Sequence, residues 1–271
     1  MTQPVSAHPA VVASRHWPEY LMEAAELASF MVIASLIVSV FEFPSSPLRQ
    51  AMPNPTLRRA LIGIATGSTA IAIAHSPLGR RSGAHFNPSI TLAFWRLGKM
   101  RSVDAAWYIA LQFLGAVAGM LLATLVLRPV VGSPSVNYIV TVPGRTGIAA
   151  AFGAELVISF GLMTVVLHVM SRPRLAHLTP IFAGAMVATY ILVVAPISGM
   201  SMNPARTTGS ALAARLWTAI WVYFTAPPLG MLLAVELFDR WRGKDTVRCA
   251  KLYHDKRSRC IFNCDHPVTH G

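Results

Sequence analysis

Charged residues are scarce in this 271-residue chain: aspartate, glutamate, lysine and arginine together make up 13% of it. Ordinary soluble domains carry about 25% charged residues. Acidic residues are the scarcer sign, with 11 of them against 23 lysines and arginines. Hydrophobic residues, in contrast, make up 54% of the sequence. The composition therefore excludes an ordinary soluble domain and indicates that long apolar segments face lipid.

The pattern of a cleavable signal peptide is also lacking. The first 16 residues are polar and contain proline, and the first apolar run is long enough to remain in the membrane. Six apolar segments can each cross a bilayer core of about 30 Å, which needs about 20 helical residues. They are residues 20–41, 60–78, 105–127, 148–170, 178–197 and 216–238.

Six spans place both termini on one side of the membrane. Sixteen of the 23 lysines and arginines then lie on that side, as expected of a cytoplasmic face under the positive-inside rule. The formal net charge of +12 is therefore explained by membrane topology, and we expect no nucleic-acid partner.

One motif occurs twice, once in each half of the chain. Residues 82–93 read Ser-Gly-Ala-His-Phe-Asn-Pro-Ser-Ile-Thr-Leu-Ala, and residues 198–209 read Ser-Gly-Met-Ser-Met-Asn-Pro-Ala-Arg-Thr-Thr-Gly. Each copy follows the second span of its half. Because each half has an odd number of spans, the second half is inverted relative to the first. Inverted repeats with interrupted helices recur in proteins that move solutes across membranes.

Each Asn-Pro pair is predicted to open a short helix. Asparagine is a favourable N-cap residue, and proline is favoured at the first helical position. A helix over residues 88–96 rises about 14 Å, roughly half the bilayer core. Two such half-helices entering from opposite faces would meet at the centre, where their positive dipole ends repel cations. The amide groups of Asn87 and Asn203 would there donate to a passing water or hydroxyl.

The two segments resemble the signature loops of the aquaporin, or major intrinsic protein, family. The resemblance covers residues 20–240, including the number and spacing of the spans. It implies an all-α membrane fold of six transmembrane helices plus two re-entrant half-helices in an inverted 3+3 repeat, assembled as a homotetramer. The implied pore centre consists of Asn87, Pro88, Ser89, Asn203, Pro204 and Ala205. Ser89 replaces the family's usual alanine, and its small side chain should change the pore little.

The resemblance also implies a filter near the outer mouth. Counting without gaps from the two asparagines assigns it to Gly67, Ile191, Met200 and Arg206. Water-selective members carry a bulky aromatic residue and a histidine at the first two positions, where this chain has glycine and isoleucine. Thr207 and Ala211 differ from the aspartate and basic residue usual in glycerol channels. We therefore expect passage of water and a larger neutral solute, such as glycerol, urea or an undissociated metalloid hydroxide.

Glu23 and Glu26 in the first predicted span and Glu155 in the fourth stand out, because acidic residues within spans are costly and usually functional. Members of the family pair one glutamate per half, each bracing the backbone of a pore-lining loop. Glu155 fits this role in the second half. Glu23 is the expected mate in the first half, and Glu26 is the alternative. A proton relay is the competing interpretation of these carboxyl groups.

All three cysteines lie in the basic tail after the last span. Cys249, His254, Cys260 and Cys264 could hold a structural zinc ion tetrahedrally. The alternatives are a solvated tail with reduced cysteines, or a tail that lies on anionic lipid headgroups. Zinc is the one cofactor that the sequence suggests.

These features favour a passive channel in the cell (inner or plasma) membrane, with both termini cytoplasmic. Residues 1–19 form an N-terminal segment, residues 20–240 the channel domain, with repeats at about 20–127 and 148–240, and residues 241–271 the tail. The alternative is an ion-coupled secondary transporter, which would need ionisable residues at the midplane beside its substrate. No nucleophile is paired with a base in the loops, so we expect no enzymatic activity.

Overall fold

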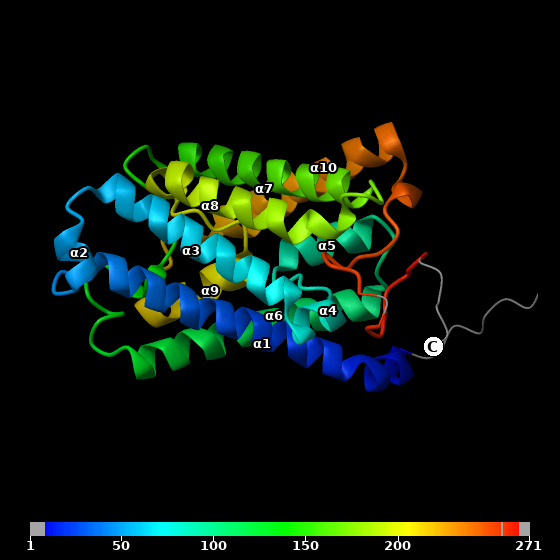
Figure 1. The fold of residues 1–271 in the computed structure, drawn as a ribbon, viewed down its shortest axis with the longest axis horizontal. Coiled ribbons are helices and arrows are strands. Elements are labelled where there is room, and N and C mark those ends of the chain that lie inside the picture. Colours follow the sequence, from blue (N-terminus) through cyan, green and yellow to red (C-terminus); the bar gives the residue numbers. More distant parts are fainter. Residues whose placement is uncertain (1–8, 256, 266–271) are drawn as a thin grey trace, which may run out of the picture.

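The computed structural model describes residues 9–255 and 257–265, and all their regular structure is helical (Figure 1). Six long helices run along the bundle: α1 (Pro9–Glu42), α3 (Pro55–His75), α6 (Ser102–Val126), α7 (Ile148–Met170), α8 (Thr179–Ser198) and α10 (Ile220–Arg242). The short helices are α2 (Pro47–Ala51), α4 (Pro77–Ser82), α5 (Pro88–Arg96) and α9 (Pro204–Ala214), with 3-10 turns η1 (Asn137–Ile139), η2 (Ala176–Leu178) and η3 (Lys244–Thr246).

The six long helices coincide with the six predicted spans and are long and apolar enough to cross a membrane. Their ends follow local chemistry. Helix α3 starts five residues earlier than predicted because the Asn54 side chain accepts from the N–H groups of Thr56 and Leu57, and Pro55 occupies the first turn. Helix α10 starts at Ile220 because Ala219 adopts a left-handed conformation, with φ of 50°.

Close helix contacts depend on glycine. A Cβ added at Gly115 of α6 would lie 2.2 Å from the carbonyl oxygen of Ala24 in α1. In the other half, a Cβ at Gly230 of α10 would lie 2.4 Å from the carbonyl oxygen of Leu156 in α7. The pairs α1–α6 and α7–α10 are related by the inverted repeat, so each half holds its first and third long helices together through small residues.

Helices α5 and α9 are half-helices that enter the bundle from opposite ends. In Figure 1, α5 lies towards the end that holds the tail, and α9 lies towards the end that holds α2. We call these the tail end and the far end. Helices of 9 and 11 residues rise about 14 and 17 Å, roughly half of a bilayer core each.

The tail packs against the tail end of the bundle. Val247, Ala250, Leu252 and Phe262 are buried, and the Leu252 N–H donates to the carbonyl oxygen of Gly83 at 3.1 Å. The alternative of a solvated tail therefore does not hold for these residues. Its apolar side chains join the same buried cluster as Ile90 of α5, so the tail and the bundle share one core.

Candidate functional site

The loops that precede the two half-helices have matching backbone conformations. Ala84 and Phe86, three and one residues before Asn87, have φ of 57° and 30°. Met200 and Met202, at the same distances before Asn203, have φ of 51° and 54°. A left-handed conformation costs a non-glycine residue about 1–2 kcal/mol, so both loops need external support.

A buried glutamate supplies that support in each half. Glu155 accepts hydrogen bonds from the N–H groups of Ser201 and Met202 at 2.9 and 2.7 Å. Glu23 accepts from the N–H groups of His85 and Phe86 at the same two distances. These four N–H groups lie in non-helical backbone and would otherwise have no partner within the loop. Each carboxylate thereby fixes the segment directly before an Asn-Pro pair.

Glu26, the alternative to Glu23, makes a different contact. Its carboxylate accepts from the Ser82 hydroxyl at 2.6 Å, one turn earlier in the loop. Gln112 of α6 is a supporting residue that the sequence reasoning missed. Its amide donates to Glu23 at 2.7 Å and to the Thr91 hydroxyl at 3.1 Å, which ties the brace to helix α5. Gln112 lies within the predicted span 105–127, and a polar side chain in an apolar span could have indicated this supporting role.

The two asparagines cap their own helices and bind each other's loops. The Asn87 side-chain oxygen accepts from Ser89 N–H at 2.9 Å, and its amide donates to the Met202 carbonyl at 2.9 Å. Asn203 caps Ala205 and Arg206 at 3.0 and 3.1 Å, and its amide donates to the Phe86 carbonyl at 2.8 Å. Each amide has two N–H groups, so this reciprocal pairing leaves one N–H per asparagine for a solute. Pro88 and Pro204 begin the two helices, and Ser89 and Ala205 are fully buried beside them.

A cavity of about 500 Å³ runs past this meeting point. Both asparagines line it, together with side chains from α1, α3 and α8. These side chains are mostly apolar: Phe30, Ala34 and Val38 from α1, Ile62, Thr66 and Ala70 from α3, and Ala183, Val187 and Ile191 from α8. At the centre the polar groups come from the two Asn-Pro loops, so the asparagines face largely apolar walls there.

Three of the four expected filter residues line the cavity: Ile191, Met200 and Arg206. Gly67 is not among the lining residues. It is buried between α3 and α8, and a Cβ there would lie 2.3 Å from the carbonyl oxygen of Gly184. Its missing side chain allows two helices to approach. The α3 side chains that face the cavity belong to residues such as Ile62 and Thr66.

Arg206 carries a buried donor that has no partner among the described residues. Its Nη1 atom is buried and has no hydrogen-bond partner among the described residues, although its side chain lines the cavity. The following residue, Thr207, anchors the loop: its hydroxyl lies 2.6 Å from the Ser201 hydroxyl and 2.9 Å from the Thr141 hydroxyl. Arg206 is therefore fixed at its backbone and can offer a guanidinium donor to the lumen.

An ion pair that the sequence reasoning missed lies at the far end of the cavity. Arg58 of α3, which is almost fully buried, donates from Nε and Nη2 to the Glu42 carboxylate at 3.1 and 3.2 Å. Its Nη1 donates to the Met52 carbonyl at 2.7 Å. Both Arg58 and Glu42 line the cavity, so this mouth has a charged and rigid wall.

The tail brings the four predicted metal ligands together. The ligand atoms of Cys249, His254, Cys260 and Cys264 all lie within 4.8 Å of one another. Hydrogen bonds to Cys260 and Cys264 raise the pKa of His254 to about 9. The hydrogen bond with Cys260 raises the pKa of the Cys249 thiol well above its usual range. Nearby Lys251 is buried, and burial lowers its pKa.

The fold and this site define a class: a polytopic membrane protein of two inverted halves whose half-helices meet in a central cavity. Residues 13–238 match the family model described as Major intrinsic protein. The chain belongs to the major intrinsic protein family, as the resemblance of its two Asn-Pro loops predicted.

Several known proteins are similar to this chain. Aquaporin NIP6-1 of Arabidopsis thaliana is 39% identical over 180 residues, which cover 66% of this chain and 57% of the relative. Aquaporin NIP3-1 of Zea mays is 37% identical over 194 residues, covering 71% and 61%. The match thus spans about three fifths of these two relatives. Aquaporin TIP4-4 of Zea mays is 31% identical over 229 residues, which cover 80% of this chain and 88% of the relative.

The aquaglyceroporin structure from Plasmodium falciparum shares the fold, with a TM-score of 0.69. The two sequences are 16% identical, and the similarity covers 85% of this chain and 98% of that one. The predicted fold class, six spanning helices with two half-helices, is therefore confirmed by the structure and by this likeness.

Proposed function

We propose that the protein is a passive transmembrane channel for water and small neutral solutes. The observation that carries this proposal is the reciprocal pairing of Asn87 and Asn203 inside the cavity. It holds two helix N-termini head to head, so their partial positive charges oppose cations. It also leaves one amide N–H group per asparagine that can donate to a solute oxygen. A binding site built of donors on one side of apolar walls suits water and hydroxyl-bearing molecules.

The filter residues favour a solute larger than water. Ile191 and Met200 offer the lumen no hydrogen-bonding side-chain donor, whereas Arg206 lines it with a guanidinium group. A solute with oxygen atoms on one edge can accept hydrogen bonds from Arg206 and lay its remaining surface on Ile191. Glycerol, urea and boric acid have this form, and they are the solutes that we propose in addition to water.

Stopped-flow measurements on proteoliposomes test the proposal. We expect protein-dependent permeation of water and of at least one of glycerol, urea and boric acid, rising linearly with the gradient and independent of any ion gradient. Ile191→Trp should suppress the larger solute far more than water, while Ile191→Val should leave both close to wild type. Flux that saturates and requires a proton or sodium gradient would instead establish an ion-coupled transporter.

We also propose that both termini lie in the cytoplasm, in the cell membrane. The charge asymmetry supports this orientation, because most basic residues lie at the tail end. Cysteine-reactive reagents that cannot cross membranes give the test. The cysteine of a Ser135→Cys variant, at the far end, should react from outside intact cells. The cysteine of a Ser258→Cys variant should react only after lysis.

A homotetramer is the assembly that we propose. The lipid-facing sides of the long helices expose large apolar residues, including Leu125 at 72%, and such faces can pack against lipid or against another copy. Native mass spectrometry in detergent should find four chains per particle. A monomer as the sole species would contradict this assembly and leave the pore within one chain intact.

A further inference from the structure

The tail cluster has the geometry of a tetrahedral metal site. Two sulfur atoms bound to one zinc ion at about 2.3 Å lie about 3.8 Å apart when the coordination is tetrahedral. Here the Sγ atoms of Cys249 and Cys260 are 3.5 Å apart, and Cys264 Sγ is 3.3 Å from His254 Nε2. All four ligand atoms lie within 4.8 Å of one another. A small ion can therefore enter with changes in the ligand–ligand distances of no more than about 1 Å.

The donor set selects the class of metal. Three thiolates and one imidazole are soft ligands that favour Zn²⁺, whereas Mg²⁺ and Ca²⁺ prefer oxygen. A Cys249–Cys260 disulfide is the competing chemistry, but it requires a sulfur separation of about 2.05 Å, well below the distance found. It would also use only two of four converging groups.

The surroundings suit the charge of such a site. Zinc with three thiolates and a neutral histidine carries a net charge of −1. Lys251 is 1% exposed, and its ammonium group donates to the carbonyl oxygens of Arg80 and Arg259 at 2.8 and 2.6 Å. A buried cation needs a compensating charge, and the metal–thiolate group supplies one.

The four ligands enclose the part of the tail that enters the bundle. Between them, the Ala250 carbonyl lies 2.8 Å from His85 Nε2, and the Leu252 N–H donates to Gly83. Phe262 stacks on the His85 ring, with centroids 5.6 Å apart. His85 stands two residues before Asn87, so these contacts join the tail directly to a pore loop.

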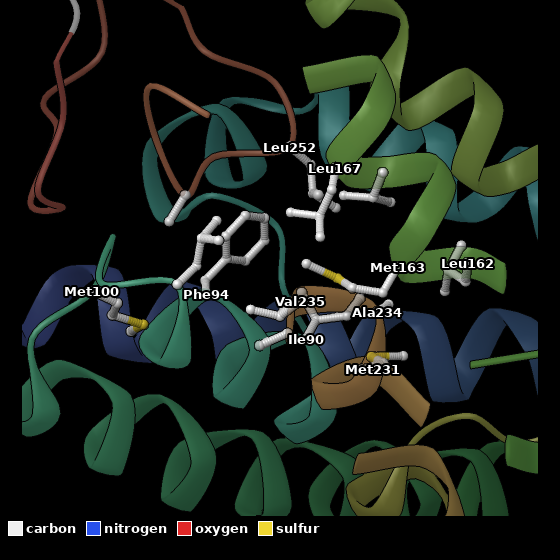
Figure 2. Packing of buried hydrophobic residues seen from close by; sticks show 14 of the residues in the cluster. Ile90, Phe94, Met100, Leu162, Met163, Leu167, Met231, Ala234, Val235 and Leu252 are labelled. Atoms are coloured by element: carbon white, nitrogen blue, oxygen red, sulfur yellow. The ribbon is translucent and has the colours of Figure 1, made fainter. Parts of the chain in front are cut away.

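Leu252 is the tail residue that reaches the cavity. It is 5% exposed and lines the cavity, although it lies 46 residues after Arg206 in the chain. It belongs to the apolar cluster of Figure 2 together with Ile90, Met163 and Leu167. Its side chain therefore forms part of the cavity wall at the tail end. The position of Leu252 depends on the fold of the tail segment between Cys249 and Cys264.

We propose that Cys249, His254, Cys260 and Cys264 bind one Zn²⁺ ion, and that this ion holds Leu252 in the tail-end mouth as a cap on the cavity. Metal binding is independent of the proposed channel function; the effect of the cap on flux rests on it.

Metal content tests the site directly. Full-length protein purified in detergent without chelator should contain about one zinc ion per chain when measured by inductively coupled plasma mass spectrometry. The double variant Cys260→Ser/Cys264→Ser should contain none, whereas His177→Ala, an exposed histidine outside the tail, should keep the metal. Cobalt exchanged into the wild type should show thiolate-to-metal charge transfer and tetrahedral ligand-field bands. Metal-free wild type, or a thiol assay that finds a disulfide, would overturn the site.

Flux tests the cap. Removing zinc from wild-type proteoliposomes with a membrane-permeant chelator should raise water flux several-fold, and added zinc should reverse the change. Leu252→Ala should raise flux with the metal still bound, which separates the cap from the ion and avoids reliance on a destabilised variant. Zinc-bound protein whose flux is unchanged by both treatments would overturn the cap. Wild type that conducts nothing in either state would count against the channel function instead.

Discussion

Replacing Glu155 with glutamine tests whether a buried carboxylate sets the shape of the second pore loop. The Glu155 carboxylate accepts three hydrogen bonds, from the Ser198 hydroxyl at 2.6 Å and from the Ser201 and Met202 N–H groups at 2.9 and 2.7 Å. Oε1 accepts from the Ser198 hydroxyl and the Ser201 N–H, and Oε2 accepts from the Met202 N–H. Glutamine has one oxygen, so an NH₂ group must face at least one of these donors.

The size of the effect follows from these contacts. A buried donor left without an acceptor costs about 1–3 kcal/mol. The bonds that remain are also weaker, because an ionised acceptor makes bonds roughly twice as strong as a neutral one. Together these losses give about 2–4 kcal/mol of local stability. Met200 and Met202 hold left-handed conformations with φ of 51° and 54°, and the loop can relax this strain once the brace weakens.

The expected result for Glu155→Gln is a fall in solute flux of at least about tenfold, which corresponds to about 1.4 kcal/mol. Proteoliposome flux per inserted protein is the assay, with a thermal melt in detergent to measure stability. Glu236→Gln is the matched control: this glutamate pairs with Arg96 at 2.6 Å on the partly exposed surface, where such pairs contribute little. If Glu155→Gln conducted like Glu236→Gln and melted at the same temperature, the brace would not control the pore.

Three other substitutions test packing and selectivity. Gly67→Phe should lower thermal stability by several degrees, because its Cβ would meet the Gly184 carbonyl at 2.3 Å; unchanged stability would place Gly67 in the lumen after all. Gly115→Val should destabilise the protein by about 1–3 kcal/mol in a thermal melt, whereas Gly153→Ala, with nothing within 4 Å, should not. Arg206→Ala should raise cation leakage and broaden the range of neutral solutes in vesicle assays, since it removes the fixed charge at the cavity wall; leakage equal to wild type would contradict that role.

The half-helices could be predicted from the sequence because their cause is local. Asparagine is an N-cap residue and proline is favoured at the first helical position, so Asn87-Pro88 and Asn203-Pro204 each indicate the start of a helix. The pairing of Glu155 with its loop follows nearly as directly, since a carboxylate within an apolar span needs donors and the adjacent non-helical loop supplies them.

The orientation of Gly67 could not be obtained in this way. Counting from Asn87 gives a position along α3, but the side of the helix that meets the lumen depends on how α3 packs against α8. Small residues in a span support two readings: space for a solute, or close approach of two helices. The Gly67–Gly184 contact favours the second, and only the three-dimensional arrangement contains it.

The packing of the tail was hidden for a related reason. Its sequence is basic and polar enough for a solvated segment, and its anchors lie far away in the chain: Ala250 and Leu252 contact His85 and Gly83, more than 160 residues earlier. The composition of the tail contains no information about these distant contacts. The surface that buries it is created only when α4, α5 and the first pore loop assemble.

The two ends of the cavity differ although its centre is nearly symmetric. At the centre, Glu23 and Glu155 repeat the same hydrogen bonds, and the two asparagines exchange equivalent ones. At the far end the wall is the buried Arg58–Glu42 pair, whereas at the tail end it includes Leu252. An inverted repeat can duplicate the centre, but the chain has one tail, and it reaches one mouth. The two mouths therefore differ where the centre does not, and the metal site that we propose in the tail would act at one mouth without altering the pore centre.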